Sequence, residues 1–221
     1  MPNLGGIKSI YGVYIQKMSS FIQTRIIPPK LPQKIIHREA LLDLLNENSG
    51  SKLILICAPA GYGKTTLVQD YLNERNKHYS WLYVNYDMDN FYTFINYFVN
   101  SLKQVKPEFG SNTFEVIERS RQRYQLTKNQ KTIFNDVIGT FVNEFCMCFS
   151  EEFTAVIDDL GNIENSQWLG AFFDLLFQNL PSNLHIIITS REVPKFDLSS
   201  LQVKREILKL DINNLTFKTA P

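Results

Sequence analysis

The residues most able to do chemistry form a glycine-rich loop at positions 58–66, which reads Ala-Pro-Ala-Gly-Tyr-Gly-Lys-Thr-Thr. An apolar run, 53–57, precedes this loop, and a segment with helical spacing, 65–72, follows it. Strand, tight loop and helix in this order are typical of a phosphate-binding loop, because successive backbone N–H groups and a helix N-terminus surround phosphate oxygens with fixed donors. The first position of the usual G-x-x-x-x-G-K-[ST] pattern is alanine here, a mild departure at the strand end. The alternative is a glycine turn that precedes a helix by chance.

The residue types in this loop suit a nucleotide with a magnesium ion. Gly61 and Gly63 allow positive φ and a close approach of the backbone to the phosphates. Lys64 reaches the β- and γ-oxygens as a point charge, and the Thr65 hydroxyl is placed to bind Mg²⁺. We therefore predict that ATP or ADP contacts Ala60, Gly61, Tyr62, Gly63, Lys64, Thr65 and Thr66.

Two further groups of polar residues stand where apolar runs end. Asp158 and Asp159 end one run, and the tripeptide Thr189-Ser-Arg191 ends another. In P-loop enzymes a carboxylate after an apolar strand holds Mg²⁺, and a neighbouring acid orients the attacking water. We assign Asp158 to the metal, Asp159 to the water and Arg191 to charge at the γ-phosphate. The alternatives are that the two acids cap the following loop and that Arg191 forms a surface salt bridge.

Strand-like and helix-like segments alternate along the chain. Expected strands cover 52–57, 79–85, 153–159, 184–191 and 206–210, and expected helices cover 38–45, 65–75, 91–103, 132–149 and 167–178. The stretch 107–131 is polar and less regular, and its three closely spaced arginines, at 119, 121 and 123, favour a solvated helix face over a nucleic-acid contact. The alternation predicts an α/β fold with a parallel sheet and helices on both faces. Ligand chemistry then collects at the carboxyl ends of the strands.

Glycines, prolines and breaks in periodicity indicate how the chain is divided. Residues 1–17 contain Gly5-Gly6 and no sustained period, which predicts an N-terminal extension and makes Met18 an alternative start. Prolines at 28, 29 and 32 enforce an extended path, so we expect an entry arm and first helix over 18–51. The core is then 52–217, and 218–221 form a tail.

Composition narrows the classes of protein. The chain has 221 residues, 44% hydrophobic and 20% charged, as in ordinary globular proteins, and its net charge of +1 gives no electrostatic case for a DNA-binding surface. The three cysteines, at 57, 146 and 148, predict no disulfide framework, and the histidines at 37, 78 and 185 are scattered, so we expect no metal site at Cys146-Met-Cys148. No apolar run approaches membrane-spanning length, so we expect a cytoplasmic protein without a membrane partner.

Several motifs in order resemble the nucleotide-binding domain of MalT-like, ATP-dependent LuxR-type transcriptional regulators, members of the STAND class of P-loop proteins. They are the loop 58–67, Trp81-Leu82, the segments 156–160 and 189–194, the arm segments 27–31 and 36–41, and the final stretch 210–217.

The resemblance implies an additional-strand P-loop ATPase core, in which the strand ending in Arg191 separates the Asp158 strand from the P-loop strand. It also implies that Arg38 and Ile36 border the adenine, that ATP and ADP are the two positions of a switch, and that hydrolysis is slow and Mg²⁺-dependent. DNA would be a partner only through sensor and helix-turn-helix domains outside this chain, which by itself we expect to be monomeric. The alternatives are a stand-alone ATPase or phosphotransferase, and a scaffold that holds ADP without turnover.

Overall fold

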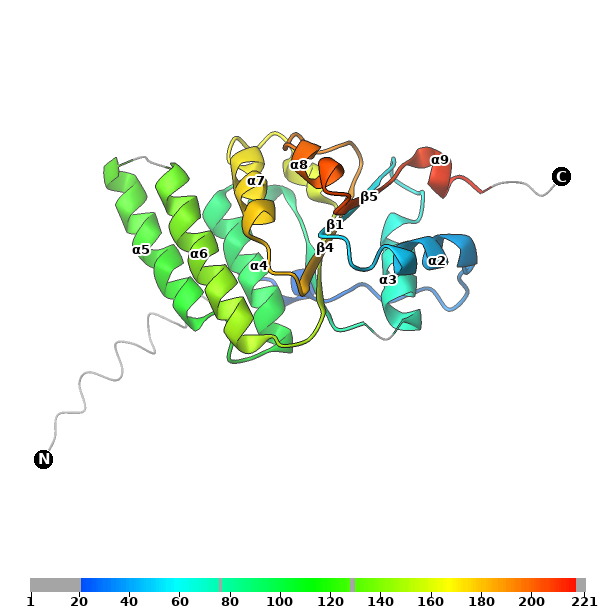
Figure 1. The fold of residues 1–221 in the computed structure, drawn as a ribbon, viewed down its shortest axis with the longest axis horizontal. Coiled ribbons are helices and arrows are strands. Elements are labelled where there is room, and N and C mark those ends of the chain that lie inside the picture. The colour runs from blue at the N-terminus through cyan, green and yellow to red at the C-terminus, as the bar shows by residue number, and fades with distance from the viewer. Residues whose placement is uncertain (1–20, 76, 128–129, 218–221) are drawn as a thin grey trace, which may run out of the picture.

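A computed structural model describes residues 21–75, 77–127 and 130–217 of the chain (Figure 1). The expected extension over 1–17 and tail over 218–221 lie outside the described residues. In the part of the chain that is described, no helix is both long and apolar enough to cross a membrane.

Five parallel strands form one sheet. They are β1 (Leu53–Cys57), β2 (Tyr79–Tyr83), β3 (Phe153–Asp158), β4 (Leu184–Ser190) and β5 (Ile207–Leu210), and they lie in the order β2-β3-β4-β1-β5. Strand β4 thus separates β3 from β1, and the register pairs Cys57 at the end of β1 with Ser190 at the end of β4. The predicted additional-strand P-loop fold is confirmed, and the carboxyl ends of β1, β3 and β4 meet at one edge of the sheet.

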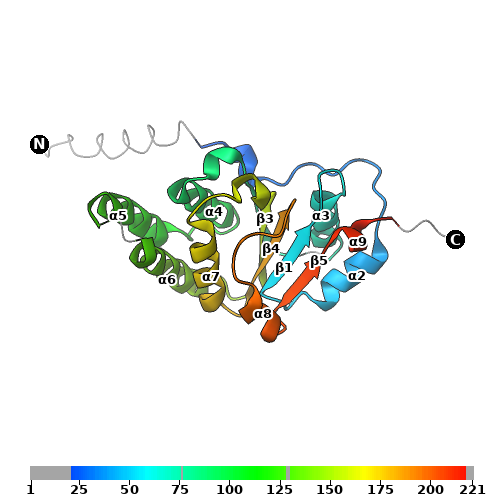
Figure 2. The same ribbon diagram turned by 90° about the horizontal axis from the view of Figure 1, so that it is seen from above.

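Helices cover both faces of the sheet, which makes three layers (Figure 2). Alternate strand residues point to opposite faces, so Leu53 and Leu55 join one buried cluster whereas Ile54 and Ile56 join the other. The face of Ile54 carries α2 (Glu39–Glu47), α3 (Lys64–Glu74) and the short α9 (Ile212–Leu215). The opposite face carries α4 (Phe91–Val105), α5 (Ser111–Thr127), α6 (Gln130–Cys148), α7 (Leu169–Asn179) and α8 (Ser199–Val203). Short 3₁₀ turns are η1 (Gln23–Ile26), η2 (Tyr86–Met88) and η3 (Leu160–Ile163).

The stretch that looked irregular in the sequence is a long helix. Helix α5 lies beside α6 (Figures 1 and 2), and the buried Glu144 of α6 holds its N-terminus. This carboxylate accepts 3.0 Å bonds from the backbone N–H groups of Asn112 and Thr113 and one from the Thr113 hydroxyl. These bonds outweigh burial and keep the pKa of Glu144 below its usual value. The prediction of irregularity was therefore wrong, because the partner that stabilises α5 lies on another helix.

The arginines of α5 face solvent, as predicted. Arg119 pairs with Glu115 across 3.0 Å one turn earlier on the same helix, and Arg123 pairs with Asp136 of α6 across 3.5 Å. All four side chains are about half exposed or more. Exposed pairs of this kind contribute little to stability.

Candidate functional site

The glycine-rich loop connects β1 to α3 with two residues in the left-handed region. Gly61 has φ +88° and Gly63 has φ +73°, and Gly63 immediately precedes the first residue of α3. An L-residue is strained in this region, whereas glycine adopts it readily. The loop therefore turns tightly from the sheet edge onto the N-terminus of an eleven-residue helix, the geometry that binds anions.

Lys64 lies inside this loop. Its ammonium group donates 2.7 Å and 3.1 Å hydrogen bonds to the backbone carbonyls of Ala58 and Pro59, and the residue is buried. Burial lowers the pKa of Lys64, while the nearby carboxylates of Asp159 and Asp158 act in the opposite direction. The charge is thus held at the centre of the loop, where phosphate oxygens would take over as its acceptors.

Asp158 is the buried carboxylate of the site and connects strands β3 and β4 with helix α3. It ends β3 and accepts hydrogen bonds from the Thr65 hydroxyl, 3.0 Å and 3.2 Å to its two oxygens, and from the Thr189 hydroxyl of β4 at 2.6 Å. Burial raises the pKa of Asp158, and the two hydroxyl donors partly offset this effect. Sequence reasoning placed Thr189 at this edge but assigned it no role.

The donor set around Asp158 fits a magnesium ion. The hydroxyl of Thr65 and the carboxylate of Asp158 are both hard oxygen ligands of the kind that Mg²⁺ prefers, and they already converge. A buried carboxylate is also stabilised by a neighbouring cation, because its own ionisation is costly in a site that excludes water.

Asp159 follows β3 in an unusual backbone conformation. Its φ is +60°, which aspartate tolerates better than most residues, and its N–H donates to the Thr189 hydroxyl at 2.9 Å. Oδ2 of its carboxylate accepts 3.2 Å hydrogen bonds from Arg191 and from Asn162 of η3. Sequence reasoning missed Asn162, which also donates to the carbonyl of Val84 and so connects the ends of β2 and β3.

A pocket of about 540 Å³ opens beside the loop on the α3 side of the sheet. Its wall includes the predicted nucleotide residues Ile36, Arg38, Gly61, Tyr62, Gly63 and Thr66. Leu215 and Phe217 close it from the C-terminal segment. Ala60, Lys64 and Thr65 do not line this pocket. Lys64 and Thr65 instead face the groups around Asp158. The predicted residues thus form two groups: one at the loop and Asp158, predicted to hold the phosphates (the phosphate end), and one along the pocket, predicted to hold the base (the base end).

Arg38 joins the entry arm to the C-terminal segment. Its guanidinium donates to the carbonyl of Leu215 and, at 3.4 Å, to that of Asn214, and it lies 4.7 Å from the ring centre of Phe217. Arg38 directly precedes α2, and its partners are thus two backbone carbonyls and an aromatic ring. Ile36 beside it is 72% exposed within the pocket wall.

The sequence that forms this site matches a known protein family. The sequence model of the family described as Nephrocystin 3, N-terminal, matches residues 32–191, from the entry arm through the glycine-rich loop and Asp158 to Arg191. The chain belongs to this family. The nephrocystin 3 N-terminal match therefore contains the glycine-rich loop, Asp158, the pocket wall contributed by the arm, and strand β4, which lies between β3 and β1.

Individual proteins extend the comparison. The chain is 26% identical to the HTH-type transcriptional regulator MalT of Vibrio parahaemolyticus, over 90% of this chain and 21% of that protein. It is also 26% identical to the serine/threonine-protein kinase PknK of Mycobacterium tuberculosis, over 86% of this chain and 17% of that one. The resemblance to MalT-like proteins is thus confirmed. The chain spans about a fifth of the length of these relatives.

Among solved structures, a STAND protein with a tetratricopeptide repeat sensor from Pyrococcus horikoshii matches 84% of this chain and 24% of its own, with 14% identity and a TM-score of 0.43.

Proposed function

We propose that this chain is the nucleotide-binding switch domain of a transcriptional regulator, one that binds ATP or ADP with Mg²⁺ and hydrolyses ATP slowly. One observation carries the proposal: the Lys64 ammonium, the Thr65 hydroxyl and the Asp158 carboxylate converge where the glycine-rich loop meets the ends of β3 and β4. The pocket that Arg38 and Tyr62 line continues from this loop and has room for a base and ribose.

The residues divide the nucleotide among them. The backbone of the loop and Lys64 hold the phosphates, while Ile36 and Arg38 border the base. Thr65 and Asp158 hold Mg²⁺, which when bound neutralises charge that develops on the phosphate oxygens. Asp159 orients the attacking water, and Arg191 stabilises the γ-phosphate charge from the end of β4.

The hydrogen bonds of Asp159 support a low turnover. Arg191 and Asn162 both donate to one oxygen of this carboxylate, so that oxygen is already occupied and less available to a water molecule while they stay in place. Arg191 is half exposed and long, and a γ-phosphate is a stronger partner for its guanidinium than a single carboxylate oxygen. Hydrolysis then waits for Arg191 to change partners.

The switch role rests on the connection from the pocket to the C-terminal segment. Arg38 contacts the carbonyls of residues 214 and 215. A conformational change in the pocket is therefore transmitted to the C-terminal end of the core, which we propose spans 52–217. The similarity to MalT supports placing this domain within a larger regulator in which other domains contact DNA.

A titration with fluorescent ATP and ADP analogues tests the proposal. We expect binding of both, Mg²⁺-dependent for ATP, and phosphate release well below one turnover per second, slow for an enzyme. Lys64→Ala removes the phosphate contact, and Lys131→Ala, an exposed lysine on α6, is its matched control. Equal affinity in all three proteins would refute nucleotide binding at this loop. Faster formation of ADP when a candidate acceptor is added would favour a phosphotransferase.

A further inference from the structure

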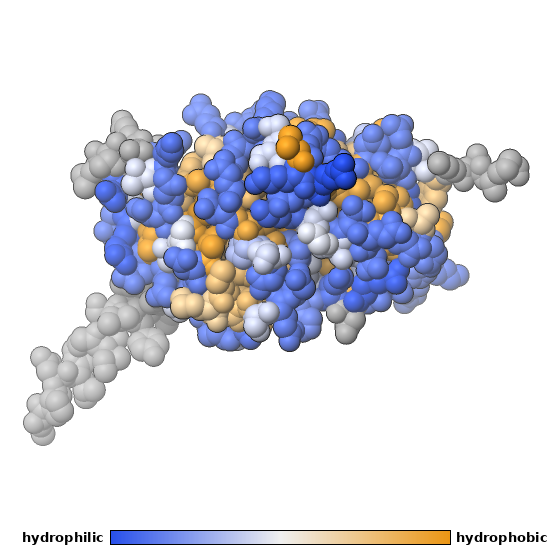
Figure 3. All heavy atoms as spheres, viewed as in Figure 1, coloured by the Kyte–Doolittle hydropathy of each residue, from blue (hydrophilic) through white to orange (hydrophobic). Residues whose placement is uncertain are grey.

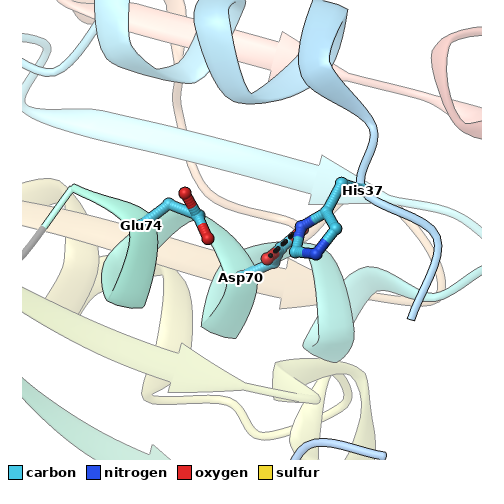
Figure 4. Close-up of side chains that lie close together, drawn as sticks. All are labelled: His37, Asp70 and Glu74. Atoms are coloured by element: carbon cyan, nitrogen blue, oxygen red, sulfur yellow. Dashed lines mark ion pairs between the residues drawn. The ribbon is translucent and has the colours of Figure 1, made fainter. Parts of the chain in front are cut away.

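The entry arm crosses α3 and is held to it by two consecutive helix residues. The Gln69 side chain donates to the carbonyl of Pro29, and the Asp70 carboxylate contacts Nδ1 of His37 at 3.1 Å (Figure 4). The arm between these two contacts contributes the wall of the base pocket, which Asp70 also lines. These two contacts therefore hold the arm beside the pocket.

A third metal-binding side chain lies beside this pair. Glu74 is one helical turn after Asp70 on α3, a spacing that puts both carboxylates on one face, and Figure 4 shows its carboxylate on the Asp70 side of the helix. One ligand atom from each of His37, Asp70 and Glu74 lies within 4.8 Å of the other two. The three residues come from two segments that only the fold brings together.

We propose that His37, Asp70 and Glu74 bind a divalent transition-metal ion of the Zn²⁺ class. Imidazole nitrogen and carboxylate oxygen are the ligands such ions prefer. Two ligands of a tetrahedral zinc ion lie about 3.3 Å apart, and the His37 and Asp70 atoms are already at 3.1 Å. Only Glu74 has to approach, and it is an exposed side chain with a flexible stem.

Burial of Asp70 adds a second argument. Its side chain is 6% exposed, whereas that of His37 is 48% exposed. An ionised carboxylate held out of water costs free energy unless a positive charge accompanies it, and a metal ion supplies that charge. Three protein ligands leave a further coordination position for water, as in open rather than fully closed zinc sites.

This site is distinct from the proposed magnesium site. Thr65 and Asp158 offer only hard oxygen donors, so Mg²⁺ suits them, whereas the imidazole of His37 favours a softer ion. Excess Mg²⁺ is therefore not expected to displace the transition metal. When occupied, the site would fasten the entry arm to α3, independently of whether the glycine-rich loop binds ATP.

Calorimetric titration of the full chain, without a polyhistidine tag and in excess Mg²⁺, tests this with Zn²⁺. Co²⁺ then reports the ligand type through its absorption spectrum. We expect one ion per chain and a cobalt spectrum without thiolate charge-transfer bands. His37→Ala and Glu74→Gln should each weaken Zn²⁺ by about tenfold or more. The matched controls His78→Ala and Glu47→Gln, both exposed, should bind like the unaltered chain.

Unchanged affinity in both His37→Ala and Glu74→Gln would overturn the site and leave His37–Asp70 as a plain hydrogen bond that positions the arm. Loss of binding in Cys146→Ser would overturn it equally, because the ion would then lie on the exposed cysteine. Thermal unfolding without metal checks each variant. If His37→Ala fails to fold, Glu74→Gln decides, since its exposed side chain can be neutralised without disturbing the core.

Discussion

Arg191 and Asn162 donate to the same carboxylate oxygen of Asp159, each across 3.2 Å, so the arginine assigned to the γ-phosphate restrains the acid assigned to the water. The pair is mutual: the Asp159 carboxylate also raises the pKa of Arg191 and keeps it charged. Asp159 itself is fixed at φ +60° by its position between β3 and η3, so the partner that can move is the half-exposed arginine.

Asp159→Asn is expected to leave ATP and Mg²⁺ binding nearly intact while suppressing hydrolysis. Asp158→Asn should mainly reduce the Mg²⁺-dependent part of binding, because only the buried carboxylate lies against the Thr65 hydroxyl. Calorimetry with and without Mg²⁺, together with single-turnover phosphate release, checks both. Equal loss of Mg²⁺-dependent affinity in the two variants would contradict this division of roles.

Asp158 should also destabilise the metal-free fold at neutral pH. Burial raises its pKa above the value in the unfolded chain, so the stability it contributes is present below the unfolded value, about 3.9, and is lost as pH rises through the folded value. Asp158→Asn should therefore melt higher than the unaltered chain at pH 7 without Mg²⁺, and the difference should shrink below about pH 4. Saturating Mg²⁺ should favour the unaltered chain. Thermal unfolding across this pH range measures the difference. A lower melting temperature for Asp158→Asn than for the unaltered chain at pH 7 without Mg²⁺ would contradict this prediction.

Lys64→Ala should weaken ATP binding by about 2 kcal/mol or more, because a charge-assisted contact inside a buried loop is lost. The fold should survive, since in this structure the ammonium bonds only to carbonyls of its own loop. Calorimetric titration measures the ATP affinity, and circular dichroism checks that the variant folds. An unaltered ATP affinity would remove Lys64 from the phosphate end.

Arg38→Ala should weaken the binding of ATP and of ADP alike, by about 1 kcal/mol, because the two nucleotides share the same base and ribose. It should also free the segment around Phe217, whose ring and backbone Arg38 contacts, and so speed amide exchange there. Titration with both nucleotides and hydrogen exchange test the two effects. Loss of ATP affinity alone would place Arg38 at the γ-phosphate instead.

Thiol reactivity should separate Cys57 from Cys146. Burial raises the pKa of Cys57 to about 11, and its thiol donates to the carbonyl of Glu192, whereas Cys146 is exposed. At pH 8 only about one Cys57 thiol in a thousand is then ionised, so a maleimide should label Cys146 first. Peptide mapping after brief labelling gives the ratio, and rapid labelling of Cys57 would mean that the end of β1 opens.

Local patterns in the sequence were sufficient for the strands, the glycine-rich loop and the fold class. Each expected strand was found within a few residues of its predicted limits, because a strand covered on both faces must be continuously apolar. The placement of Asp158 and Arg191 at one edge followed from parallel topology alone. What did shift was Asp159, which lies beyond β3 in the left-handed region rather than inside the strand.

Only the tertiary structure decided the contacts between distant segments. Thr189 reaches Asp158 across 31 positions, Arg38 reaches Leu215 across 177, and His37 meets Asp70 from a proline-rich arm. Helix α5 depends in the same way on Glu144. None of these contacts leaves a periodic pattern, because each depends on where two separately packed surfaces meet, and that position is determined by the whole core rather than by either segment.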